Sequence, residues 1–194
     1  MKKNVLIFLM VAGSSFATIA QTNWVIDKNH SNIGFSVMHY VITEVEGDFK
    51  DFDGSVVAKG EDFDGAEVEF VAMTASISTD NEKRDNHLKS DDFFNAAEFP
   101  EIKFKGNIQK KDGKLQLVGD FTMRDVTKKV AFDVQHNGTV DLGKSKKAGF
   151  KITGTVDRFE YGVKFDRALE TGGLVVGQEV DITCNIELNE NKGT

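Results

Sequence analysis

The stretch TDNEKRDNHLKSDDFFNAAEFPEIKF, residues 79–104, is the one segment whose pattern does not predict strand. Thr79 followed three residues later by Glu82 is typical of a capping box, in which each side chain bonds an otherwise unpaired backbone N–H group. We therefore predict that a short helix begins at Thr79. Ser90 before two aspartates predicts a second N-cap, and Pro100 ends the segment before the next strand.

One face of this predicted helix collects different kinds of side chain. Positions i, i+3, i+4 and i+7 hold a cation, an imidazole, an apolar side chain and a carboxylate: Arg84, His87, Leu88 and Asp91. With Phe93 and Phe94 close behind, the face predicts a lid over an apolar interior. A segment that only closes one end of a barrel, with Arg84 in a structural ion pair, explains the same pattern. The residues alone favour this structural role over a ligand-binding role.

Outward from this segment, apolar and polar residues alternate with a period of two, as in strands with one buried face. Asp112-Gly113 and Asn137-Gly138 are typical of tight hairpins. We expect about eight strands, and therefore an all-β sandwich or a closed antiparallel barrel. Residues 157–173 receive no assignment. The predicted strand segments are 24–27, 30–40, 45–49, 52–57, 67–78, 102–105, 115–121, 127–134, 150–156 and 180–188.

The chain is rich in phenylalanine, with 16 in all. Several fall on the inward parity of their strands, and a barrel of eight strands can either be filled by such rings or be lined by them around a tunnel. The inward set comprises Phe35, Phe70, Phe104, Phe121 and Phe132.

Residues 1–20 predict a secretory signal peptide. Two lysines precede an apolar run at residues 5–11, and small residues lead to Ala20, where we expect cleavage. The run is too short for a membrane anchor, so we expect a periplasmic or secreted protein without a transmembrane segment. Residues 21–194 then form one domain of 174 residues (194 − 20).

Charge and cysteine content narrow the possible functions. Without Lys2 and Lys3, 22 basic residues (24 − 2) face 31 acidic ones, a net charge of 22 − 31 = −9, which disfavours nucleic acid as a partner. Cys184 is the only cysteine, so no internal disulfide forms, and its inward parity makes it a small apolar residue.

Catalytic and metal-binding patterns are missing from the sequence. His30 and His39 would point to opposite faces of an uninterrupted strand, and the four histidines are too dispersed for a ligand spacing. We expect no cofactor, no metal and no enzyme activity. Convergence of Arg84, His87 and His39 in space is the one arrangement that would support catalysis.

Several motifs together resemble one family. Trp24-Val25-Ile26-Asp27 precedes His30-Ser31, and Gly47-Asp48-Phe49 follows. The longest block runs from Arg84-Asp85 through His87-Leu88-Lys89-Ser90 and Asp92-Phe93-Phe94 to Phe99-Pro100. Gly119-Asp120-Phe121-Thr122 and Asp157-Arg158-Phe159 with Gly162 complete the set. Over residues 23–188 the chain is similar to the YceI-like family, with one departure at Lys129, where the family commonly has proline.

The resemblance implies an extended, lipocalin-like, eight-stranded antiparallel β-barrel with a short helical lid. Its tunnel would hold a polyisoprenoid or other long-chain lipid, for carriage, storage or stress response in the cell envelope, and a homodimer is possible. Arg84 and His87 would meet the head group. The candidate ligand-binding residues are Phe35, Val37, His39, Phe70, Arg84, His87, Phe104, Phe121 and Phe132.

Two alternatives remain open at this stage. One is a hydrolase or isomerase that acts on an amphipathic substrate with His39 or His87 as the base. The other is a structural or interaction barrel whose phenylalanines fill the core and leave no room for a ligand.

Overall fold

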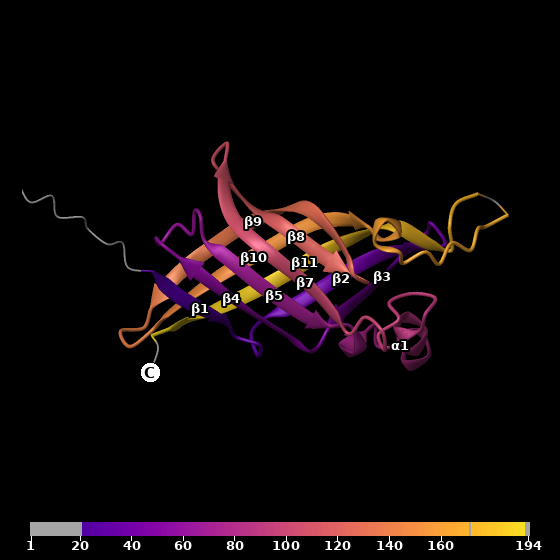
Figure 1. Ribbon diagram of the computed structural model, residues 1–194, viewed down its shortest axis with the longest axis horizontal. Helices are drawn as coiled ribbons and strands as arrows, with labels where there is room; N and C mark the ends of the chain where they lie inside the picture. Colours follow the sequence, from indigo (N-terminus) through magenta and orange to yellow (C-terminus); the bar gives the residue numbers. More distant parts are fainter. Residues whose placement is uncertain (1–20, 171, 193–194) are drawn as a thin grey trace, which may run out of the picture.

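The computed structural model describes residues 21–170 and 172–192, so the predicted signal peptide lies outside the described residues. Every strand pair is antiparallel (Figure 1). One α-helix, α1 (Glu82–Lys89), and two short 3-10 helices, η1 (Thr74–Ser76) and η2 (Arg158–Tyr161), join the strands. The strands are β1 (Thr22–Ile26), β2 (Asn32–His39), β3 (Thr43–Phe49), β4 (Phe52–Ala58), β5 (Glu67–Met73), β6 (Ile77–Ser78), β7 (Glu101–Lys111), β8 (Lys114–Met123), β9 (Val126–Asp141), β10 (Lys146–Asp157) and β11 (Val176–Asn191).

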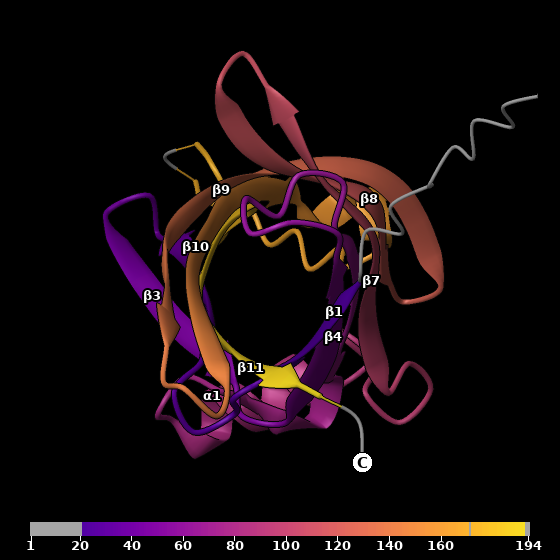
Figure 2. The same ribbon diagram turned by 90° about the vertical axis from the view of Figure 1, so that its left-hand side faces the viewer.

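The strands close into a barrel. The order is β1-β4-β5-β7-β8-β9-β10-β11, and β11 pairs again with β1. β2 extends the line of β1, because both pair with successive parts of β11. β3 extends the line of β4 on the next side, because β3 pairs with β2 and β4 pairs with β1. The predicted antiparallel barrel of eight strands is therefore confirmed, and the ring is visible end-on in Figure 2.

Side-chain alternation places phenylalanines inside the barrel and lysines outside. On β7, Phe104 is 4% exposed while its neighbours Lys103 and Lys105 face solvent. Gly106 and Gly119 pair directly across β7 and β8. A Cβ at either glycine would lie under 3.0 Å from the Phe104 ring, so the missing side chains make room for that ring.

One end of the barrel is closed by the loop between β4 and β5, residues 59–66. Phe63 in this loop is fully buried, and its ring lies 5.4 Å from Trp24 and 4.8 Å from Phe150, centroid to centroid. The loop is fastened to β7, because Gly65 N–H donates to the Ile108 carbonyl at 2.9 Å. We call residues 59–66 the plug.

The opposite end is covered by residues 79–100, which we call the lid, and two sequence predictions about it are wrong. The helix begins at Glu82 with Asn81 as its N-cap, since Asn81 Oδ1 accepts from Arg84 N–H at 3.0 Å; Thr79 instead donates its backbone N–H to Asp85 at 2.8 Å. Asn81, two residues nearer the helix, takes the capping role.

Ser90 is a C-cap rather than a second N-cap. Its hydroxyl donates to the His87 carbonyl at 2.7 Å, and the chain continues in turns rather than as a helix. Asp91 is therefore exposed beyond the end of α1 instead of on the predicted helix face. The strand predicted after Pro100 is confirmed, since β7 begins at Glu101.

Candidate functional site

A cavity of about 190 Å³ lies inside the barrel between the plug and the lid, so the barrel is not simply filled by its phenylalanines. Its wall is almost wholly apolar and draws on both halves of the chain. Six of the nine residues predicted from the sequence line it: Phe35, Val37, Phe70, Phe104, Phe121 and Phe132.

A second row of lining residues comes from β10 and β11. The sequence placed the residues of β11 on the inward parity but assigned them to the core rather than to a cavity wall. Cys184 belongs to this row, and burial raises the pKa of its thiol to about 12, which keeps it protonated and unreactive. The row comprises Ile152, Val156, Val180, Ile182, Cys184, Ile186 and Leu188.

The lid supplies the wall at its own end of the cavity. Leu88, Phe93 and Phe94 all line it. Phe93 is 4% exposed and stacks on Phe165 at 4.9 Å, while Phe94 meets Phe49 edge-on at 6.0 Å. The lid predicted over an apolar interior is thus present, although its helix starts later than expected.

Arg84 and His87 do not line the cavity; both side chains are exposed on the lid. The Arg84 guanidinium donates to the Thr79 carbonyl at 2.6 Å and to the Thr79 hydroxyl at 2.7 Å, which ties α1 to the residue after β6. His87 Nε2 lies 2.8 Å from Asp92 Oδ2. Their hydrogen bonds connect parts of the lid to one another.

His39 also lies outside the cavity wall. It is the last residue of β2, and its ring packs edge-on against Tyr40 at 4.3 Å. The alternation of the strand correctly predicted which face His39 is on, but along β2 the cavity extends only as far as Val37. The structure therefore does not bring Arg84, His87 and His39 together around the cavity.

Arg158 is the cationic residue that does line the cavity, and the sequence analysis missed its role. It is 4% exposed, and its guanidinium donates to the carbonyls of Val163 (2.7 Å), Phe165 (2.7 Å), Val176 (2.9 Å) and Gly177 (2.8 Å). Burial lowers the pKa of Arg158 from its ordinary value. The family motif Asp157-Arg158-Phe159 was the available signal, but it falls in the connection that received no assignment.

Arg124 fastens the lid from outside the cavity. It sits in the tight turn between β8 and β9, and its Nη1 donates to the Phe93 carbonyl at 2.6 Å and to the Gly162 carbonyl at 2.9 Å. Its guanidinium also lies 5.4 Å from the Phe99 ring centroid. One side chain thus joins the lid to the segment after η2.

A polar cluster occupies the break between β1 and β2. Asp27, His30 and Glu187 bring potential metal ligands within 4.8 Å of one another. Lys147 Nζ, however, lies 3.0 Å from Asp27 and 2.5 Å from Glu187 and supplies the positive charge there. Chiefly because of the hydrogen bond from Lys147, the pKa of Asp27 is held well below its usual range. This cluster is an ion-pair network that joins the break to β10 and β11.

Within residues 21–170 and 172–192, no helix has the length and apolar character needed to cross a membrane.

Comparisons with known proteins agree with this architecture. The family model of the YceI-like domain matches residues 24–188. A UPF0312 protein of Staphylococcus aureus (strain USA300) is 37% identical over 170 residues, which cover 87% of this chain and 98% of that protein. Among solved structures, the YCEI protein of Campylobacter jejuni has a TM-score of 0.69 at 26% identity, covering 86% of this chain and 96% of that one.

A more distant structure shares the fold alone. A polyisoprenoid-binding domain from Saccharophagus degradans has a TM-score of 0.62 at 12% identity, covering 87% of this chain and 98% of that one.

Proposed function

The chain belongs to the YceI-like family, and from that premise we propose that it binds a long-chain isoprenoid or related amphipathic lipid in the cavity. The observation that carries the proposal is the apolar wall, which runs from Ile108 and Leu188 near the plug to Leu88 and Val163 near the lid. A space of that form suits a hydrocarbon chain. The polyisoprenoid-binding domain that shares the fold supports the same ligand class.

The energetics of such burial are favourable. Moving a methylene group from water to an apolar site contributes roughly 0.8 kcal/mol, so ten buried methylenes supply about 8 kcal/mol. That sum corresponds to a dissociation constant of about 1 μM before the cost of immobilising the chain is subtracted. A ligand longer than ten carbons is therefore needed for tight binding.

We further propose that the cavity binds without catalysis. Among the described residues that line it, the titratable ones are a thiol whose pKa is raised to about 12, an arginine already bonded to four carbonyls, and Glu69, whose carboxylate faces solvent and pairs with Lys105 at 2.6 Å. General acid-base chemistry needs a group that can exchange a proton near neutral pH. His39 and His87, the bases of the enzymatic alternative, are not part of the wall.

The polar head of the ligand would lie at the lid. Arg84 and His87 remain our predicted head-group contacts, although both are engaged with lid residues, and a bound head group would have to compete with those hydrogen bonds.

We also propose that residues 1–20 direct export of the protein to the periplasm or out of the cell. We propose a role in carriage, storage or stress response, and a homodimer.

The test uses two neighbouring positions on β11. Ile182 lines the cavity, whereas Thr183 is exposed on the outer face of the same strand. Ile182→Trp should block the cavity and Thr183→Trp should not. We would measure binding of geranylgeraniol, a twenty-carbon isoprenoid alcohol, by titration calorimetry and by the rise in melting temperature that a native-state ligand must cause.

The proposal predicts binding by the unmodified protein and by Thr183→Trp, and at least tenfold weaker binding by Ile182→Trp. Farnesol and geraniol, with fifteen and ten carbons, should bind progressively more weakly. No binding by the unmodified protein to any of the three alcohols, or equal binding by the two variants, would contradict it.

A further inference from the structure

Four exposed apolar residues gather at the turn between β2 and β3, which we call the tip (residues 38–42). Met38, Tyr40, Val41 and Ile42 are 39%, 46%, 59% and 79% exposed. In the part of the chain that the structure describes, only three other large hydrophobic residues are this exposed, and none of them lies near residues 38–42 in the sequence. The tip is therefore the largest concentration of exposed apolar side chains on the described chain.

The backbone conformation of the tip favours small or polar residues, yet the tip carries large apolar ones. Tyr40 and Val41 have φ angles of 52° and 63°, in the left-handed region. Glycine and asparagine adopt that conformation readily, whereas a β-branched residue such as Val41 is strained there. Residues suited to the turn would have been small or polar, so the apolar side chains are not explained by the needs of the hairpin.

The tip directly follows a strand that lines the cavity. β2 lines the cavity with Phe35 and Val37, and the chain reaches Tyr40 three residues later. Tyr40 N–H donates to the Val175 carbonyl at 2.9 Å, next to Val176, which also lines the cavity. The tip thus lies at the lid end of the barrel, beside the connection that leads into β11 (Figure 1).

We propose that the tip inserts into a lipid bilayer and so brings the lid end of the barrel to the membrane surface. The inference rests on the proposed function, because a lipid that fills the cavity has to leave or enter a membrane. It adds where on the molecule that exchange takes place.

The shape of the tip favours a bilayer over a protein partner, and the charge beside it indicates which lipid. A stable protein interface buries about 800 Å² on each side, more than one narrow hairpin turn supplies. A convex turn with a tyrosine beside aliphatic residues instead matches the apolar and interfacial zones of a bilayer. Glu44 and Glu46 follow the tip on β3, so we expect insertion into neutral rather than anionic lipid.

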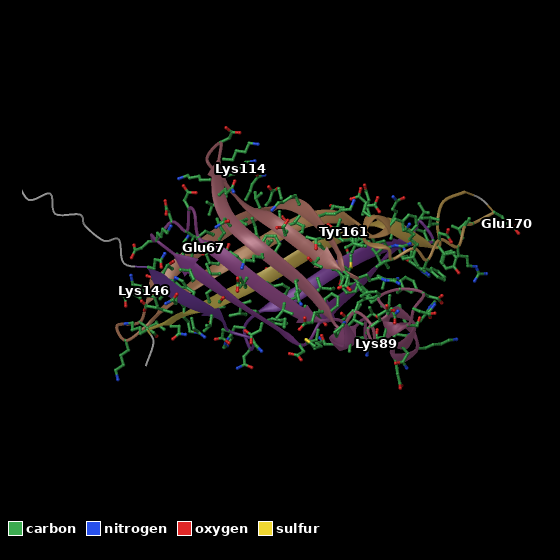
Figure 3. All side chains as sticks on the ribbon, viewed as in Figure 1. Glu67, Lys89, Lys114, Lys146, Tyr161 and Glu170 are labelled. Atoms are coloured by element: carbon green, nitrogen blue, oxygen red, sulfur yellow. The ribbon has the colours of Figure 1, made fainter. Side chains whose placement is uncertain are left out.

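The far end of the barrel provides a matched control. Val140 and Leu142, at the turn between β9 and β10, are 58% and 56% exposed. Lys146, just after that turn, and Glu170, in the connection beside the tip, lie at opposite ends of the molecule (Figure 3). We would compare the triple variant Tyr40→Ser, Val41→Ser, Ile42→Ser with the double variant Val140→Ser, Leu142→Ser.

The assay is flotation with phosphatidylcholine vesicles, using protein whose mass shows that it begins at Gln21. The unmodified protein and the double variant should float with the vesicles, and the triple variant should partition at least tenfold less. Serine suits a turn with positive φ no worse than valine does, so the triple variant should fold, and its melting temperature checks this.

A second readout reports insertion directly. Trp24 is the only tryptophan and is 4% exposed, so its emission should not respond to vesicles. Ile42→Trp should add emission that shifts to shorter wavelength with vesicles and is quenched by brominated lipid. Leu142→Trp should show neither change.

Binding of geranylgeraniol in the absence of vesicles separates this inference from the proposed function. If the triple variant binds geranylgeraniol as the unmodified protein does but loses vesicle binding, the inference holds. If vesicle binding is absent from the unmodified protein, or is equal in both multiple variants while geranylgeraniol still binds, the tip does not insert into a bilayer and the inference is wrong. If geranylgeraniol does not bind at all, the proposed function fails first.

Discussion

The plug and the lid close the two ends of one barrel by different kinds of contact. At the plug, Phe63 packs against the rings of Trp24, His136 and Phe150, and the loop is bonded to the backbone of β7. At the lid, Arg124 donates to the Phe93 carbonyl, and the Arg158 guanidinium, which is bonded to carbonyls outside the lid, lies 6.0 Å from the Phe93 ring centroid. The plug is thus part of the core, whereas Phe93 is the only fully buried apolar residue of the lid, and helix α1 has no buried residue.

This difference indicates the end of the barrel at which a ligand enters and leaves. Opening the plug would expose the fully buried Phe63 and the rings packed against it, while releasing the lid would expose Phe93 and the partly buried Leu88 and Phe94 and would exchange protein hydrogen bonds for hydrogen bonds to water. A ligand should therefore enter and leave at the lid end, where the tip also lies. The predictions below test this contrast, beginning with the largest expected effect.

Arg158→Met should destabilise the fold most. It leaves four carbonyls without their donor, and because buried unpaired groups cost about 1–3 kcal/mol each, we expect a loss of roughly 4 kcal/mol after partial relaxation. Urea unfolding measures it. Arg167→Met, at an exposed arginine of the same connection, is the control and should change stability by under about 0.5 kcal/mol. Equal stability of the two variants would remove Arg158 as an anchor.

Phe63→Ala should cost about 3–4 kcal/mol, because the surrounding rings collapse only partly into the space left behind. Its effect on ligand release should nevertheless be small, since the plug is not the route. Stopped-flow release of a fluorescent isoprenoid measures this second quantity. Faster release from Phe63→Ala than from a lid variant would reverse the assignment of the two ends.

Arg124→Ala should cost less, about 1–2 kcal/mol, for the hydrogen bonds to Phe93 and Gly162. Release of the ligand should become about tenfold faster, and amide hydrogens of residues 90–99 should exchange faster than those of residues 59–66. Lys129→Ala removes an exposed ion pair with Asp120 and is the matched control, with no effect expected on either measurement. Unchanged exchange at residues 90–99 would contradict the role of Arg124.

The smallest effect concerns pH and the cluster at the break between β1 and β2. The folded protein holds the pKa of Asp27 below its ordinary value of 3.8, so the cluster stabilises the fold above that pH and loses its contribution as the pH falls further. Melting temperatures from pH 6 to pH 2.5 should fall more steeply for the unmodified protein than for Asp27→Asn. Parallel curves would show that Asp27 is not the titrating group.

The barrel and much of the cavity wall could be predicted from the sequence, because the alternation of apolar and polar residues along a strand is a local property. A period of two fixes which residues face inward, and six of the nine candidate residues do line the cavity. Parity does not say how far along a strand the cavity extends, which is why His39 was included although it lies past the end. Nor does a capping pattern choose between neighbours, and Asn81 displaced Thr79 as the N-cap.

The anchors could not be found by the same reasoning. Arg158 and Arg124 act on carbonyls of residues distant in the sequence or in irregular connections, where no periodicity exists. Arg84 and His87 show the converse, since a helical spacing grouped them correctly on the lid but could not show that their hydrogen bonds stay within it. Distances that depend on the closed barrel were needed in both cases.

The most direct test of the central claim, that the cavity holds a long-chain lipid, is mass spectrometry of an organic extract. The protein would be purified without detergent from the cells that naturally make it. We predict about one isoprenoid or related long-chain lipid per chain, absent from the extract of Ile182→Trp. An empty extract that stays empty after incubation with isoprenoid lipids would contradict the claim.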